Sequence, residues 1–469
     1  MENKNVVIIV VFVLILSVGG NLMLYLRNGT LESYVEEVEN NLVDSKHNNS
    51  ILVQEIKDLN DVVNDLIKDK GYLELINQMI INNMQERRNY SVPYKFVVSE
   101  VLQEGDLHQL TEEELIDTSK RYDMIITNYY DENKDPINAL KNMNPELKIL
   151  MYTNIHSVDS SNGETINIFR ENDWILKDEQ GGEIHEKGWP FNLCVDVGNA
   201  EYRDWASSRI ANRISQLGFD GVLGDNTNPL LETTYGVSAP AVNPRTGETY
   251  TPEDYRGDMI SLVQDIKQSM GDGIYIGNGV GHLQGDATLG YWQMLSFIQP
   301  LIEAEDGVMM EGFLRWKEEN WRSESEWQMN VEALRQLSDD DSTYTLAWLK
   351  VYGDLPDGSS WDEVAEFGVT SYLLGVEGAN SYFSISGYDY DIFNSSNYSW
   401  QDIGFPIEPY HLIEGTSVYE RAYTGSIIFV NPSSETAEIS LNEAMNTLEG
   451  HITDSITLHP HTGVILMRR

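Results

Sequence analysis

The sequence predicts an α/β protein: a (β/α)8 TIM barrel with a C-terminal antiparallel β domain, preceded by a transmembrane helix and a coiled-coil stalk. Three observations predict this order. An apolar run occupies Val6 to Leu26, a heptad repeat follows from Leu31 to Met84, and short apolar runs then alternate with helix-length polar segments. The predicted boundaries are 1–5 for a cytoplasmic stub, 6–26 for a transmembrane signal anchor, 30–90 for the stalk, 93–408 for the barrel and 409–469 for the β domain.

The run from Val6 to Leu26 is long enough to cross a bilayer as a helix, because about 20 apolar residues span a hydrocarbon core of roughly 30 Å. A cleaved signal peptide is the alternative, with Ser17 and Gly19 as the small residues before a cut. Apolar residues continue past that point, which favours a retained single-pass anchor. The short N-terminal side carries Lys4 and is expected to be cytoplasmic, which places the rest of the chain outside the cell membrane.

Apolar residues recur in alternating steps of four and three from Leu31 to Met84, a pattern typical of a coiled coil. With Leu31 at position d, Asn49 and Asn77 fall at position a. An occasional Asn among β-branched residues at this position favours a parallel dimer, so we expect a parallel homodimer. The alternative is a long helix packed on its own globular domain, but no proline lets the chain turn back before Pro93.

The chain beyond Pro93 contains eight candidate strands: Phe96–Val101, Met124–Thr127, Lys148–Thr153, Gly221–Asp225, Gly273–Asn278, Gly307–Glu311, Thr343–Leu349 and Ser381–Ile385. Helix-length segments separate them. One runs from Glu201 to Leu217, with Asn199 placed to cap its start and Gly218 placed to end it. Eight such alternations predict a barrel, with a doubly wound open sheet as the alternative. No Gly-x-Gly-x-x-Gly turn supports a dinucleotide-binding fold.

The last segment, 409–469, loses the helical pattern. Alternating runs such as "ITLHPHTGVILMRR" turn at Asn-Pro-Ser-Ser and at His-Thr-Gly, which predicts a small antiparallel β domain.

The formal net charge of −44 argues against a nucleic-acid partner, because phosphates require neutralisation by Lys and Arg. Such a surface fits either solubility, including solubility in high salt, or an acidic patch for a cationic substrate. The single cysteine, Cys194, excludes an intrachain disulfide, and the nine histidines show no HExxH or similar spacing. We therefore expect no metal and no other cofactor.

Functional side chains of a barrel gather at the C-terminal ends of its strands. Asp225 lies there in "GFDGVLGDN", and Glu311 lies there in "GVMMEGF". Two carboxylates that flank one glycosidic bond are the catalytic groups of most glycoside hydrolases. Other residues assigned to strand ends, or close to them, are predicted to bind a polysaccharide: Tyr129, Asn154, Asp196, Asn226, Asn278, Trp348 and Tyr382.

Each of these residues also has a purely structural interpretation. A single Asp at a strand end more often caps a helix or forms a turn. Asp196 and Asn278 fit turns, and Trp348 and Tyr129 fit the core equally well. The presence of two acids at the same end of buried strands is what favours catalysis.

The run "CVDVGNAEYRDWASSRIANRISQLGFDGVLGDN", with "IYIGNG" and "GVMMEGF" after it, resembles the hypothetical glycosyl hydrolase family fifteen. Those barrel proteins are similar to endo-α-1,4-polygalactosaminidase-like enzymes. The resemblance extends over residues 94–469 and implies a polysaccharide substrate, with Asp225 as nucleophile or base and Glu311 as acid. Gly224 departs from the pattern, in which a bulkier residue is more usual.

Three hypotheses follow. The first is a membrane-anchored, extracytoplasmic glycoside hydrolase, in which Glu311 holds a proton as the acid. The second is a non-catalytic glycan-binding or cell-surface structural protein on a barrel scaffold. The third is an envelope protein that interacts through its coiled coil, which leaves the paired acids unexplained. The separation of the two carboxyl groups distinguishes the first hypothesis from the second: roughly 5–5.5 Å indicates a retaining enzyme and roughly 6.5–9.5 Å an inverting one, whereas more than about 12 Å favours the scaffold.

Overall fold

The computed structural model describes residues 95–102, 111, 115, 118–120, 122–127, 135–231, 236–279, 291–315, 320–340, 342–351, 355, 358–385 and 398–469. The predicted membrane segment 6–26, the stalk 30–90 and Tyr129 lie outside these ranges. Within them, no helix is long and apolar enough to cross a membrane. No group of three or more His, Cys, Asp or Glu in these same ranges is placed to hold a metal ion.

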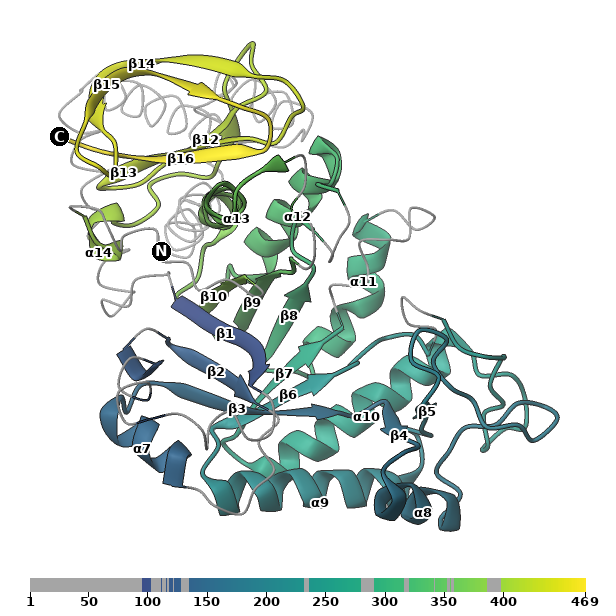
Figure 1. The fold of residues 1–469 in the computed structure, drawn as a ribbon. Coiled ribbons are helices and arrows are strands. Elements are labelled where there is room, and N and C mark those ends of the chain that lie inside the picture. Colours follow the sequence, from purple (N-terminus) through teal and green to yellow (C-terminus); the bar gives the residue numbers. More distant parts are fainter. Residues whose placement is uncertain are drawn as a thin grey trace, which may run out of the picture. The chain divides into compact units, whose positions relative to one another are not determined.

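The central element is a curled parallel sheet (Figure 1). Its strands are β1 (Lys95–Leu102), β2 (Met124–Thr127), β3 (Lys148–Asn154), β6 (Gly221–Asp225), β7 (Ile274–Asn278), β8 (Gly307–Glu311), β9 (Tyr344–Leu349) and β10 (Ser381–Ile385). They are hydrogen-bonded in chain order, and β1 pairs with both β2 and β10, which closes the sheet into a barrel. Each predicted strand agrees with an observed one to within one residue at either end.

Helices alternate with these strands: α7 (Asp135–Met143), α8 (Gly163–Glu171), α9 (Ala200–Leu217), α10 (Pro252–Met270), α11 (Tyr291–Ile302), α12 (Glu324–Leu337), α13 (Trp361–Gly375) and α14 (Trp400–Ile403). The caps predicted for α9 are confirmed. The Asn199 side chain accepts hydrogen bonds from two backbone N–H groups of the first turn, and Gly218 ends the helix with a φ of 83°. Figure 1 shows α9 and α10 outside the sheet, where their apolar faces cover it.

The interior of the barrel is filled by alternate side chains of the strands from β2 to β10 that form the sheet, as the pleat of a β-strand requires. The residues of this inner cluster are Met124, Ile126, Leu150, Leu223, Ile276, Met309, Leu346, Trp348 and Tyr382. Asp225, Asn278 and Glu311 follow Leu223, Ile276 and Met309 by two residues, so they continue the inward-facing series at the carboxyl end. The local sequence thus places an acid or an amide at the end of three consecutive barrel strands.

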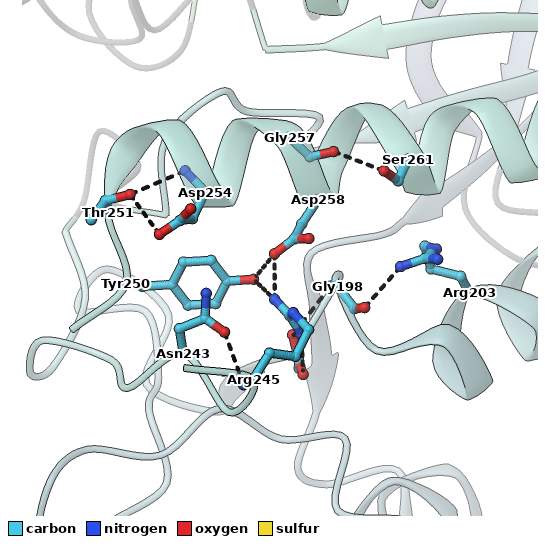
Figure 2. Close-up of polar contacts among 11 residues, drawn as sticks. Gly198, Arg203, Asn243, Arg245, Tyr250, Thr251, Asp254, Gly257, Asp258 and Ser261 are labelled. Atoms are coloured by element: carbon cyan, nitrogen blue, oxygen red, sulfur yellow. Dashed lines mark hydrogen bonds and ion pairs between the residues drawn. The ribbon is translucent and has the colours of Figure 1, made fainter. Parts of the chain in front are cut away.

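An insertion between β3 and β6 carries a small antiparallel pair, β4 (Ser157–Asp159) and β5 (Asn192–Cys194), together with α8. A polar cluster joins its end to α10 (Figure 2). The Arg245 guanidinium donates to both carboxylate oxygens of Asp196, at 2.9 and 3.0 Å, and also contacts Tyr250 and Asp258. Gly198 lies against this guanidinium and has no room for a Cβ.

The C-terminal segment forms an antiparallel sheet of β11 (His411–Leu412), β12 (Tyr419–Ala422), β13 (Ser426–Asn431), β14 (Ala437–Asn446), β15 (Ile452–Leu458) and β16 (Thr462–Met467). It packs on α13. The buried Arg421 guanidinium donates to the carbonyl oxygens of Leu373, Leu374 and Val376 at the end of that helix and forms an ion pair with Glu377. The predicted order of a parallel α/β sheet followed by an antiparallel β sheet is therefore confirmed.

Candidate active site

Asp225 and Glu311 end two barrel strands, β6 and β8, that lie on either side of β7. Asn278 ends β7, and its side chain lies between the two acids. Its amide nitrogen Nδ2 donates to Asp225 Oδ1 at 2.9 Å and to Glu311 Oε2 at 2.8 Å. The predicted residues Asp225, Asn278 and Glu311 are therefore brought together as one polar group.

The shared amide sets an upper limit on the distance between one oxygen of Asp225 and one oxygen of Glu311. The two accepting oxygens are no farther apart than the sum of their distances to Nδ2, about 5.7 Å, and about 5 Å if both N–H bonds point straight at them. Asn278 Oδ1 is buried and has no hydrogen-bond partner among the described residues. A buried acceptor left in this state next to two acids is available to a bound hydroxyl group or water.

The other contacts of Asp225 come from neutral donors. The Tyr152 hydroxyl donates to Oδ2, and the backbone N–H of Asn226 donates to Oδ1 at 3.0 Å. The pKa of Asp225 is raised, first because burial removes water from the carboxylate and second because Glu311 carries the same charge. The hydrogen bonds from Tyr152, Asn278 and Asn226 oppose this rise.

Glu311 has a cation beside it. The Lys350 ammonium forms an ion pair with Glu311 Oε1, and both side chains are about one-tenth exposed. The same ammonium lies 4.5 Å from the centroid of the Trp348 ring. Lys350 directly follows β9, so a strand next to β8 supplies the positive charge.

A third carboxyl group, that of Glu186 in the β4–β5 loop, is 2% exposed. Burial raises its pKa, and the charge of Asp225 adds to this rise, whereas a hydrogen bond from Ser157 Oγ at 2.8 Å opposes it. His156 lies 4.0 Å from Glu186, but burial lowers the pKa of this histidine to about 4, so it is neutral near pH 7. Glu186 is therefore a buried acid whose pKa is raised in part by the charge of Asp225.

The sequence places Tyr152 at the end of its strand but assigns it no role, and sequence reasoning missed Lys350 and Glu186. Lys350 had a local signal, because a lysine immediately after a buried strand of a barrel points toward the functional end. Tyr152 is placed by the same two-residue alternation that places Asp225. Glu186 lies in an irregular loop, and no local pattern identifies it.

Three other predicted residues have structural contacts. Asn154 Oδ1 accepts from the backbone N–H groups of His156 and Ser157, both at 2.9 Å, and so forms a turn. Asp196 is 2% exposed and paired with Arg245. Asn226 adopts a left-handed backbone conformation with a φ of 57°, which turns the chain just after Asp225. These contacts explain Asn154 and Asp196 without a substrate.

The two predicted aromatic residues with described positions belong to the barrel interior. Trp348 is 8% exposed, and its ring lies beneath the Lys350 ammonium. Tyr382 is 1% exposed, pairs with Leu346 in mid-strand, and stacks on Tyr344 at the start of β9. The prediction that Tyr382 lies at the carboxyl end is therefore wrong, because it is the second residue of β10 and the strand continues to Ile385.

Gly224, the departure from the family pattern, has a steric explanation. A Cβ at this position would lie 2.1 Å from the hydroxyl oxygen of buried Tyr275, which contacts Thr227 Oγ1 at 2.8 Å. Glycine therefore accommodates the tyrosine of the next strand directly before Asp225.

A closed α/β barrel that carries two carboxylates bridged by one amide at the carboxyl end has the architecture of a glycoside hydrolase. The chain belongs to hypothetical glycosyl hydrolase family 15, whose match covers residues 141–426. This range includes Asp225, Asn278, Glu311 and Lys350. No curated protein matches the chain significantly.

Several solved structures are similar in fold. A noncanonic maltogenic α-amylase, AmyB from Thermotoga neapolitana, is 12% identical over 80% of this chain and 97% of that one, with a TM-score of 0.46. An α-amylase from Lactobacillus plantarum is 10% identical over 81% and 100%, with a TM-score of 0.48. The glycoside hydrolase domain of PelA from Pseudomonas aeruginosa is 13% identical over 59% and 92%, with a TM-score of 0.37. At these TM-scores, none of the likenesses assigns a substrate or a mechanism to this chain.

Proposed function

We propose that this protein hydrolyses glycosidic bonds of a polysaccharide with retention of anomeric configuration, and that Asp225 and Glu311 are its catalytic residues. The observation that carries the proposal is the Asn278 amide, which donates to both carboxylates and holds their nearest oxygens within about 5.7 Å. Retaining enzymes have carboxyl groups about 5–5.5 Å apart, whereas inverting enzymes need about 6.5–9.5 Å to admit a water molecule.

In such a site one carboxylate attacks the anomeric carbon while the other carboxyl group protonates the leaving oxygen. Asn278 fixes the relative positions of the two groups. Its Oδ1 is suited to accept a hydrogen bond from a sugar hydroxyl, which would satisfy a buried acceptor that lacks a partner among the described residues. Asn226, at the turn after Asp225, is a further candidate for substrate contact.

The proposed setting of this activity comes from the N-terminal sequence. We place the catalytic head outside the cell membrane, with 6–26 as a retained single-pass anchor and 30–90 as a dimeric coiled-coil stalk. We place the barrel domain at 93–408 and the β domain at 409–469. Amino-terminal sequencing of the membrane-extracted protein tests the anchor, and a mature chain that starts near Asn21 would contradict it.

The activity is tested by incubating residues 93–469 with a panel of neutral, acidic and amino-sugar polysaccharides and measuring new reducing ends. We expect hydrolysis of at least one polymer by the parent protein and none by Asp225→Asn. If neither protein releases reducing ends but both bind a polymer, the protein is a glycan-binding scaffold and the proposed function is wrong.

A further inference from the structure

Among the described residues, the acidic groups of the candidate site form one ion pair with a lysine or arginine, that of Glu311 with Lys350. Asp225, Glu311 and Glu186 supply three carboxyl groups, and Lys350 supplies the ammonium. The Tyr152 hydroxyl of β3 donates a hydrogen bond to Asp225. Since three negative charges opposite one cation are costly in a partly dehydrated site, the position of Lys350 decides which carboxyl group keeps its charge.

The ion pair between Lys350 and Glu311 is held by the backbone as well as by charge. The carbonyl oxygen of Trp348 accepts hydrogen bonds from Gly312 N at 3.0 Å and Phe313 N at 2.9 Å, directly after Glu311. Lys350 stands two residues after Trp348 and lies over its ring. The two charged side chains therefore leave neighbouring strands from a fixed register, with an aromatic face beneath the ammonium.

Asp225 has the opposite environment. Its direct contacts are the Tyr152 hydroxyl, the Asn278 amide and a backbone N–H, all of them neutral. The nearby carboxyl groups of Glu311 and Glu186 both disfavour a negative charge at this position. The surroundings of Asp225 therefore favour its protonated form.

We propose that Glu311 is the nucleophile, that Lys350 is the positioning residue that holds it as a carboxylate, and that Asp225 is the acid and base. This inference rests on the proposed function and reverses the roles that the family resemblance implies. It also replaces the expectation that Glu311 holds the proton, which took no account of Lys350.

The steps balance as an ordinary double displacement. A Glu311 oxygen forms an ester bond with the anomeric carbon as the glycosidic C–O bond breaks, and the Asp225 proton moves to the leaving oxygen. Water then attacks the anomeric carbon and gives a proton to Asp225. The ester C–O bond breaks, and Glu311 returns as a carboxylate beside Lys350.

A titration of Asp225 tests the inference without a substrate. Infrared spectra of the full chain are recorded as the pH is varied, and the spectra of Asp225→Asn are subtracted from those of the parent. We expect the protonated-carboxyl band of Asp225 to persist above the ordinary range of an aspartic acid, because burial and the charge of Glu311 raise its pKa. Loss of this band within the ordinary range overturns the assignment of Asp225 as the acid.

Azide rescue tests the chemistry on an activated aryl glycoside of the sugar identified in the polysaccharide panel. Asp225→Ala with azide should yield a glycosyl azide of retained configuration, because Glu311 still forms the ester. Glu311→Ala with azide should yield the inverted glycosyl azide. If Asp225→Ala gives the inverted azide and Glu311→Ala the retained one, the inference is overturned while the proposed function stays intact. If the parent is inactive, the proposed function is wrong, and the titration decides the roles.

Lys350→Met and Lys350→Arg separate a charge effect from packing. We expect Lys350→Met to lower kcat/KM by about tenfold or more and to shift the acidic limb of the pH profile upward, because Glu311 loses its cation. Lys350→Arg should restore most of the rate and the parent profile. An unchanged pH profile in active Lys350→Met overturns the positioning role.

Discussion

At the scale of single residues, the burial of Asp225 that places it in the candidate site also makes its ionised form costly to the stability of the fold. Its pKa is raised by burial and by Glu311, so the folded protein holds this proton more tightly than the unfolded chain does. Ionisation of Asp225 therefore costs folding free energy. The cost is absent below the ordinary pKa near 3.8, grows as the pH rises from there, and is complete above the pKa of the folded state.

We therefore predict that Asp225→Asn lowers kcat at least about 10³-fold and at the same time raises the Tm at neutral pH. The gain in Tm should disappear near pH 4, where the unfolded chain also binds the proton. Thermal unfolding at both pH values tests this, with Asp272→Asn, an exposed position, as the control. A lower Tm than the parent at neutral pH would show that Asp225 has a net stabilising structural role.

The residues that sequence reasoning placed best are those governed by strand alternation. Asp225, Asn278 and Glu311 follow buried apolar residues by two positions, which is a local property. Lys350 and Glu186 lie near Glu311 and Asp225 only in the folded protein, because these partners are distant in sequence. Their effect on the two carboxylates could therefore not be predicted from the sequence. Asn154 and Asp196 have structural contacts that their sequence does not reveal, because a substrate-binding polar residue and a turn-forming one look alike in sequence.

At the scale of elements, the eight barrel strands were predictable because each is a short apolar run bounded by polar or glycine residues. The position of a residue along its strand was harder to predict. The bounds predicted for β10 are right, but Tyr382 lies near its start and not at its carboxyl end. The β4–β5 insertion was not predicted, since its strands span three residues each and lack a periodic pattern.

That insertion depends on Arg245, which neutralises buried Asp196 and joins it to Asp258 of α10. We predict that Arg245→Leu lowers the free energy of unfolding by about 3 kcal/mol, because it leaves the Asp196 carboxylate buried without a cation. Denaturant unfolding measures this effect. Adding Asp196→Asn should recover part of the loss.

The matched control is Arg170→Leu, which breaks an exposed ion pair with Glu183 and should change stability little. If the two arginine variants unfold at the same denaturant concentration, the Arg245 cluster does not stabilise the fold.

At the scale of the whole molecule, the heptad repeat predicts that the head is presented as a pair. A polypeptide that begins at Leu31 should sediment as a dimer, and one that begins at Pro93 should sediment as a monomer. Replacing Asn49 and Asn77 by Leu should keep the association but relax its register or stoichiometry. Equal monomeric masses for the two polypeptides would exclude the stalk as a dimerisation element.

We propose that the Asn278 amide holds the Asp225 and Glu311 carboxylates at the spacing of a retaining glycosidase. The most direct measurement is proton NMR of the first product released from an aryl glycoside or oligosaccharide substrate, before mutarotation. We expect the new hemiacetal to have the anomeric configuration of the bond that was cleaved. A first product of inverted configuration would contradict it, because Asp225 and Glu311 would then not be the two carboxylates of a double displacement.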